Sequence, residues 1–440
     1  MTNTSSIRGR LDGQLLRPGD PGYDRSRLVW NAMVDRRPRM IVRCATVDDV
    51  VVAVRTAREL DLEIGVRCGG HSVLGLAVPD DGLMIDLTPM AEVHVDPARR
   101  TARVQGGALL GALDAASQRH GLATTAGNVS HTGVGGLTLG GGMGWLARRY
   151  GLTCDNVIAF EMVTAEGTVC RATETENAEL FWGLRGGGGN FGIVTEFVFR
   201  LHPVGTRALS VELDFPAEGG ADVLAGWRDL APSAPSQATF TANVGGGVVT
   251  VGYVWVGDPD AGRQVATQLQ ALGRPSAERV EDLSYLQLQI RDDSTEGHAL
   301  RRYWKGHYFR ELPDAALDAV VAHDPAISVS LQGYGGAIAE VPDDATAFSH
   351  RDAAFEYVAS ARWTDPAEDD DRIAQARTCA ATLAPFASGA YVNALSDEGE
   401  EGVRRAYPTG KLARLTALKD AYDPDNVFHL NQNIRPSRSS

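Results

Sequence analysis

Glycine is distributed very unevenly along this chain of 440 residues. The chain holds 49 glycines, and the first half gathers many of them into clusters at 69–70, 106–107, 133–144 and 186–192. Glycine has no Cβ, so it adopts positive φ readily and lets backbone come close to a ligand. We therefore predict that several loops of the first half converge on one large ligand.

The segments between these clusters alternate between strand and helix patterns. Thr46 precedes a helix pattern at 47–59, whose first turn carries Asp48 and Asp49, where the helix dipole favours acids. Apolar spacing predicts a second helix at 109–120. Strands are expected at 40–44, 63–67, 83–87, 93–95, 102–105, 157–164, 168–171 and 193–199.

The pattern changes around His202 and Pro203. Apolar residues at every second position of 208–215 predict a half-buried antiparallel strand. The stretch 391–436 is expected to hold only small, turn-rich elements. Other elements expected in this half are strands at 244–256, 328–331 and 355–362 and helices at 260–272 and 315–322. Together these features predict a second domain in which helices cover an antiparallel sheet.

Composition and charge narrow the possible partners. The net charge of −14 repels phosphate backbones and anionic lipid surfaces, which disfavours nucleic-acid and membrane partners. No apolar run approaches the ~20 residues that cross a bilayer, and the first ten residues lack a secretory signal pattern, so a cytoplasmic location is expected. The five cysteines show no C-x-x-C spacing, which predicts neither a disulfide framework nor a metal site.

Two stretches match the dinucleotide fingerprint G-x-G-x-x-[GA], but neither has the context that a Rossmann site needs. The match that ends at Gly192 follows a helix pattern and precedes a strand, which reverses the required order. The match that starts at Gly142 has no strand before it. A P-loop is excluded because no glycine cluster is followed by Gly-Lys-Ser/Thr. The ligand is therefore expected to be held by several loops.

His71 stands between a glycine pair and Ser72, directly after an expected strand. The backbone amides of 67–72 have the spacing of an anion-binding nest for a pyrophosphate. The histidine is either an inert turn residue or a nucleophile, base or metal ligand, and the lack of a second ligand at metal spacing disfavours the metal. His131 is expected to have a structural or ligand-packing role.

The chain also carries several longer motifs in a fixed order. They are Arg67-Cys68-Gly69-Gly70-His71-Ser72, Thr132-Gly133-Val134-Gly135-Gly136 with 140–144, 182–195, Tyr391-Val392-Asn393, and 422–428 with 431–434. In these motifs the chain resembles the PCMH-type FAD-linked oxidases of the vanillyl-alcohol-oxidase superfamily, in particular the berberine-bridge-enzyme-like branch. The resemblance spans nearly the whole chain.

The resemblance implies an α+β fold with a two-part FAD-binding domain. Residues 1–205 and 385–440 are expected to form that domain, and residues 206–384 are expected to form a substrate-binding domain between them.

The resemblance further implies an FAD attached covalently to His71. Val129 stands where many relatives carry a second, cysteinyl link, so a single link is expected. The residues expected to bind the cofactor are His71, Arg67, Cys68, Gly69, Gly70, Ser72, Gly127, Val129, Thr132, Gly135, Gly136, Gly142, Val194, Tyr391, Asn393 and Asn431.

By the same resemblance, Tyr391 is the expected catalytic residue, as a base or as a group that orients a substrate hydroxyl; the alternative is a packing tyrosine. Met143 replaces a tyrosine that some relatives use. Other aromatic residues of the middle region were weighed as pocket or core residues: Tyr253, Tyr303, Tyr334 and Trp363.

The expected reaction is oxidation of a small organic molecule, a secondary metabolite, with molecular oxygen as electron acceptor. Val129, Thr132 and Leu137 form a pattern similar to that of monocovalent bacterial flavoproteins of antibiotic biosynthesis, which makes oxygenation through a flavin N5-oxide an alternative. A sugar or alcohol oxidase, a dehydrogenase and a non-catalytic flavin-binding protein are further alternatives. The oligomeric state is left open.

Overall fold

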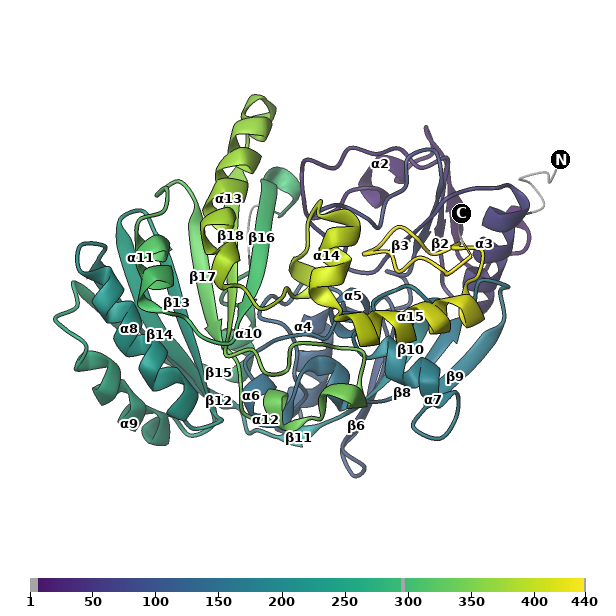
Figure 1. Ribbon diagram of the computed structural model, residues 1–440. Coiled ribbons are helices and arrows are strands. Elements are labelled where there is room, and N and C mark those ends of the chain that lie inside the picture. Colours follow the sequence, from purple (N-terminus) through teal and green to yellow (C-terminus); the bar gives the residue numbers. More distant parts are fainter. Residues whose placement is uncertain (1–6, 294–296, 439–440) are drawn as a thin grey trace.

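The computed structural model describes residues 7–293 and 297–438, and it confirms the expected α+β architecture. Figure 1 shows the purple N-terminal and yellow C-terminal segments together on the right, while a large sheet with its helices forms the left part. No helix within the described ranges is both long enough and apolar enough to cross a membrane.

A four-stranded sheet places the first glycine loop. Its order is β1 (Gln14–Leu16), β2 (Met40–Arg43), β4 (Leu83–Asp86) and β3 (Ile64–Arg67), and β2, β4 and β3 run parallel. Because β3 ends at Arg67, the segment from Cys68 to Ser72 begins at its carboxyl end. The helix α3 (Val47–Glu59) starts with the expected cap, since Thr46 Oγ1 accepts a hydrogen bond from Asp49 N–H.

A five-stranded antiparallel sheet brings the other glycine clusters to the same region. Within it, Gly106 N–H donates to Thr195 O at 2.7 Å, so the cluster after β6 lies beside the cluster before β10. The order is β5 (Val93–Asp96), β6 (Thr101–Gln105), β10 (Ile193–Arg200), β8 (Val157–Val163) and β9 (Val169–Thr173). The adjoining elements are α2 (Tyr23–Ser26), α4 (Leu110–Gln118), β7 (Leu122–Ala123), α5 (Val134–Leu139), α6 (Ala147–Tyr150), α7 (Ala178–Leu184) and β11 (His202–Pro203).

The middle of the chain forms a seven-stranded antiparallel sheet. Its order is β15 (Ala277–Ser284), β12 (Arg207–Pro216), β14 (Val248–Val256), β13 (Ala238–Gly245), β17 (Ser328–Gly333), β18 (Phe355–Trp363) and β16 (Arg301–Phe309). As expected, helices pack against this sheet (Figure 1): α8 (Gly220–Leu230), α9 (Pro259–Gln270), α11 (Asp314–Val321) and α13 (Asp369–Leu383). The short helices α10 (Tyr285–Ile290) and α12 (Ala337–Glu340) complete this part.

Two expectations about secondary structure were wrong. The single strand expected at 244–256 is a hairpin, because Gly246 and Gly247 adopt φ values of 58° and 80° and turn the chain between β13 and β14. The stretch 391–436 holds two helices, α14 (Gly399–Ala406) and α15 (Thr409–Tyr422). The helix α15 escaped prediction because its buried residues form no continuous apolar stripe.

The end of the chain is anchored to the last glycine cluster. Lys419 of α15 and Asp423 form an ion pair of 2.6 Å in which both side chains are fully buried. Lys419 Nζ also donates to the carbonyls of Asn190 and Phe428, and Asn190 Oδ1 accepts from Ile434 N–H. The C-terminal segment is therefore joined to the glycine loop that precedes β10.

Candidate functional site

A cavity of about 660 Å³ lies where the glycine loops meet the middle sheet. One side is formed by the segments around 68–72, 127–137, 188–194 and 428–432, and the other by residues of β16, β17 and β18. The glycine clusters therefore converge on one region, as their distribution predicts.

The cavity brings together most of the residues expected to bind the cofactor. Two of them lie outside its lining: the Arg67 guanidinium donates to Ser26 O, and Gly142 N–H donates to the hydroxyl of Tyr391. The expected residues that do line the cavity are Cys68, Gly69, Gly70, His71, Ser72, Gly127, Val129, Thr132, Gly135, Gly136, Val194, Tyr391, Asn393 and Asn431.

The glycine loops pack backbone against backbone and leave room beside them. A Cβ on Gly69 would lie 2.3 Å from the nitrogen of Gly133, so neither loop tolerates a side chain at this contact. A Cβ on Gly136 or Gly189 would meet nothing within 4 Å, although both residues line the cavity. This arrangement lets a ligand lie directly against the main chain.

His71 lies in a cluster of rings at the cavity wall. Its Nε2 is 2.7 Å from Nδ1 of His131, and its Nδ1 is 3.4 Å from the hydroxyl oxygen of Thr132. The ring stacks on Trp30 with centroids 4.7 Å apart. Burial, reinforced by His131 and Arg302, lowers the pKa of His71 to about 3. The imidazole is therefore neutral near pH 7.

Tyr391 is held by two hydrogen bonds to its hydroxyl oxygen. The donors are Gly142 N–H and the Asn393 side-chain amide, each at 2.9 Å. Burial, together with the charge of Glu356, raises the pKa of Tyr391 above its ordinary value. The phenol therefore keeps its proton, which is available for donation into the cavity.

Glu356 of β18 also faces the cavity, and sequence reasoning missed it. Tyr334 Oη donates to its carboxylate at 2.8 Å, and burial raises the pKa of Glu356 to about 7. The strand alternation of β18 was the available signal, since it sets 356, 358, 360 and 362 apart from the buried odd positions. A carboxyl group with this pKa exchanges protons readily near neutral pH.

None of the four aromatic residues of the middle region that were weighed from the sequence lines the cavity. Trp30 and Trp304 line it, with ring centroids 5.5 Å apart. Tyr253, Tyr303 and Trp363 are buried in the core of the middle domain, and Tyr334 reaches the site only through its bond to Glu356.

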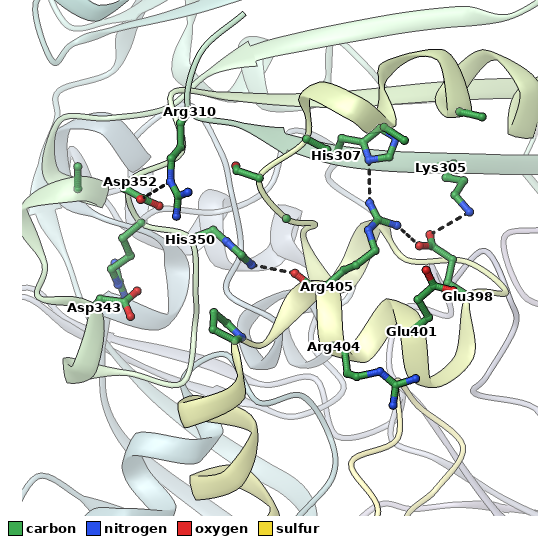
Figure 2. A pocket seen from close by; sticks show the side chains of 18 of the residues that line it. Lys305, His307, Arg310, Asp343, His350, Asp352, Glu398, Glu401, Arg404 and Arg405 are labelled. Atoms are coloured by element: carbon green, nitrogen blue, oxygen red, sulfur yellow. Dashed lines mark hydrogen bonds and ion pairs between the residues drawn. The ribbon is translucent and has the colours of Figure 1, made fainter.

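A second cavity, of about 1310 Å³, lies between β16, α13 and α14. Figure 2 shows that its charged groups are bonded mainly to one another. Arg405 donates to His307 Nδ1 and pairs with Glu398, and Arg310 pairs with Asp352. None of the residues expected at the cofactor site lines this second cavity.

Comparisons with known proteins decide the family. Residues 38–173 match the FAD binding domain family, and residues 390–435 match the "berberine and berberine like" family. An FAD-linked oxidoreductase from Dictyostelium discoideum is 33% identical over 97% of this chain and 95% of its own. The chain belongs to the berberine-bridge-enzyme-like FAD-linked oxidoreductases.

Three further comparisons show how far the similarity extends. (R)-6-hydroxynicotine oxidase from Paenarthrobacter nicotinovorans is 30% identical over 98% of both chains. The crystal structure of 6-hydroxy-D-nicotine oxidase from Arthrobacter nicotinovorans superposes with a TM-score of 0.90 at 30% identity, covering 97% of this chain and 98% of that one. Glucooligosaccharide oxidase from Sarocladium strictum is 28% identical over 94% of this chain and 91% of its own.

The cavity of this berberine-bridge-enzyme-like protein fits an FAD. The side-chain oxygens of Asn128 and Asn431 are buried at its lining without a donor among the described residues. They suit the N–H and hydroxyl donors of a flavin and its ribityl chain. The bare glycine backbone at Gly136 and Gly189 gives an extended ligand the close approach that it needs.

Proposed function

We propose that the protein carries FAD linked to His71 alone and oxidises a small organic molecule, a secondary metabolite, with oxygen as electron acceptor. The observation that supports this most directly is the pair formed by His71 and His131 beside the glycine loops. With the shared proton on Nε2 of His71, the Nδ1 atom carries the lone pair and is the nucleophile. His131 accepts the Nε2 proton when Nδ1 forms its new bond, so the linked His71 stays neutral and the positive charge passes to His131.

A second covalent link is not expected. Glucooligosaccharide oxidase has a 6-S-cysteinyl, 8α-N1-histidyl FAD, whereas Val129 offers no sulfur at the corresponding place. Cys68 also lines the cavity, but its Sγ contacts Ala108 O at 3.4 Å, and burial raises its pKa to about 11. A thiol that stays protonated is a poor nucleophile.

FAD supplies the acceptor for the two electrons of the oxidation. Glu356 takes the proton that the substrate loses, because its pKa lies near neutrality and its carboxyl faces the cavity. Tyr391 donates its phenolic proton to a substrate oxygen and orients it. Since the pKa of Tyr391 is raised, we assign it the orienting role rather than that of a base.

The function is tested by anaerobic bleaching of the bound flavin with a panel of metabolites, followed by admission of air. We expect one class of compound to bleach the flavin, and fast reoxidation with release of hydrogen peroxide. Slow reoxidation would favour a dehydrogenase, and incorporation of oxygen from O₂ into the product would favour the oxygenating alternative. Failure of every compound to bleach the flavin would favour a binding protein.

A further inference from the structure

The strand register of the middle domain arranges the substrate-facing wall in rows. Residues 356, 358, 360 and 362 of β18 all line the cavity, because alternate side chains of a strand face one side. Strand β16 runs antiparallel beside it, which sets Trp304 opposite Ser360 and Arg302 opposite Arg362. Glu356 lies at one end of this wall and the two arginines lie at the other.

Arg302 and Arg362 are like charges at directly paired positions, an arrangement that destabilises an antiparallel sheet. The Arg302 guanidinium is buried, lies 4.1 Å from the ring centroid of Trp30, and donates to the carbonyls of Trp30 and Leu300. Arg362 is exposed, and its side chain makes no hydrogen bond or ion pair with residues 7–293 or 297–438. The fold thus places Arg362, which has no counter-ion among the described residues, beside the second positive charge of Arg302.

Neither of the described carboxylates that line the cavity, Asp292 and Glu356, forms an ion pair with Arg362. Asp292 lies 3.4 Å from Arg291, and its pKa is raised by burial. Glu356 is six residues along the strand from Arg362, a separation of about 20 Å at the usual rise per residue. Within the described residues, the positive charge of Arg362 is therefore available to a ligand.

Unpaired hydrogen-bond donors lie along the same wall. The indole N–H groups of Trp30 and Trp304 and the side-chain amide nitrogen of Gln332 are buried, and none has an acceptor among the described residues. Gln332 pairs with Glu356 in the register of β17 and β18. Because buried donors are almost always satisfied, their partners are expected to be acceptor atoms of the ligand.

We infer that the substrate is an elongated organic acid whose carboxylate binds Arg362. Its other end reaches Glu356 and Tyr391, where oxidation takes place. Its oxygen atoms accept hydrogen bonds from the indole N–H groups of Trp30 and Trp304. This inference rests on the proposed oxidative function, since it assigns the substrate class of the same cavity. It makes Arg362 a specificity-determining residue that does not take part in the chemistry.

The test uses a hydroxy acid long enough to span this wall, 16-hydroxyhexadecanoate, and its uncharged amide as probes, titrated into the oxidised flavoprotein while the flavin absorbance is recorded. We expect the wild type to bind the acid at least ten-fold more tightly than the amide. Arg362→Gln should weaken binding of the acid about 10- to 100-fold, the range for a lost hydrogen bond to a charged group, and leave the amide unchanged. Arg362→Lys should retain part of the preference.

Arg274→Gln is the matched control, because Arg274 is equally exposed but does not line the cavity. An equal or absent response to the acid and the amide in the wild type, or an unchanged preference in Arg362→Gln, would overturn the inference. The titration needs neither turnover nor a covalent link. Loss of the Arg362 effect with metabolite bleaching intact would therefore refute the substrate class and leave the proposed function standing.

Discussion

Replacing Lys419 by methionine should strongly destabilise the protein. The ammonium group is fully buried and binds three acceptors, namely the Asp423 carboxylate and the carbonyls of Asn190 and Phe428. Methionine fills a similar volume but donates no hydrogen bond. The substitution would leave Asp423 as a buried charge whose remaining hydrogen bonds, among the described residues, come from the backbone N–H groups of Val427 and Phe428.

Breaking a buried ion pair by removing one partner typically costs about 3–5 kcal/mol. We expect Lys419→Met to lower the free energy of unfolding by this amount in a urea titration followed by circular dichroism. The pair anchors the chain end to the glycine loop at the cavity. FAD should therefore also dissociate more readily from any fraction of the protein that lacks a covalent link.

The chain offers a control with the same i,i+4 spacing. Arg404 and Glu400 are 62% and 52% exposed, and surface pairs of this kind contribute about 0–1 kcal/mol. Arg404→Met should therefore change stability little. If Lys419→Met costs no more than Arg404→Met, the reasoning about burial at this anchor is refuted.

Two further changes test the proposed chemistry. His131→Gln should reduce the covalently bound fraction of FAD, because His71 Nε2 loses the ring nitrogen 2.7 Å away that accepts its proton. The remote substitution His323→Gln should leave that fraction unchanged. Flavin fluorescence in denaturing gels measures the bound fraction, and full attachment in His131→Gln would contradict the role of His131. Because Glu356 must be ionised to act as a base and its pKa is about 7, flavin reduction by substrate should slow roughly ten-fold per pH unit below 7 in the wild type and lose this dependence in Glu356→Gln. The pKa of Glu356 is raised above its unfolded value, so its contribution to stability is present at low pH and lost as the pH rises to about 7. The free energy of unfolding of the wild type minus that of Glu356→Gln should therefore fall as the pH rises to about 7. A difference that does not change with pH would count against the raised pKa.

Local features of the chain were predictable from sequence. The glycine clusters predicted loops that converge on one ligand, because only glycine fits where the backbones of Gly69 and Gly133 meet. The cap at Thr46 and the alternation of β12 follow from rules that involve only near neighbours in the chain. The motif around His71 carried the resemblance that the family comparisons confirm.

Features that depend on distant pairing were not predictable. The alternation of β18 puts Glu356 on one face of the strand, but that this face lines the cavity follows from the position of β18 in the fold, which no local pattern encodes. The approach of His131 to His71 joins residues 60 positions apart. Conversely, Arg67 and Gly142 belong to the motifs but do not line the cavity, because a motif specifies residue types and not which of them reach the ligand: the Arg67 side chain donates to Ser26 O, and Gly142 N–H donates to Tyr391. The edge strand β15 is charged and exposed on both faces, so it lacks the alternation by which strands are recognised.

The central claim is that His71 alone holds the flavin. The most direct test is the intact mass of the acid-denatured protein, compared between the wild type and His71→Ala. We predict that the wild-type mass exceeds that of the chain by one covalently bound FAD and that peptide mapping places the modification on His71. The variant should show no such increase in mass. Release of all flavin from the wild type in acid, or a covalent flavin retained by His71→Ala, would contradict the account.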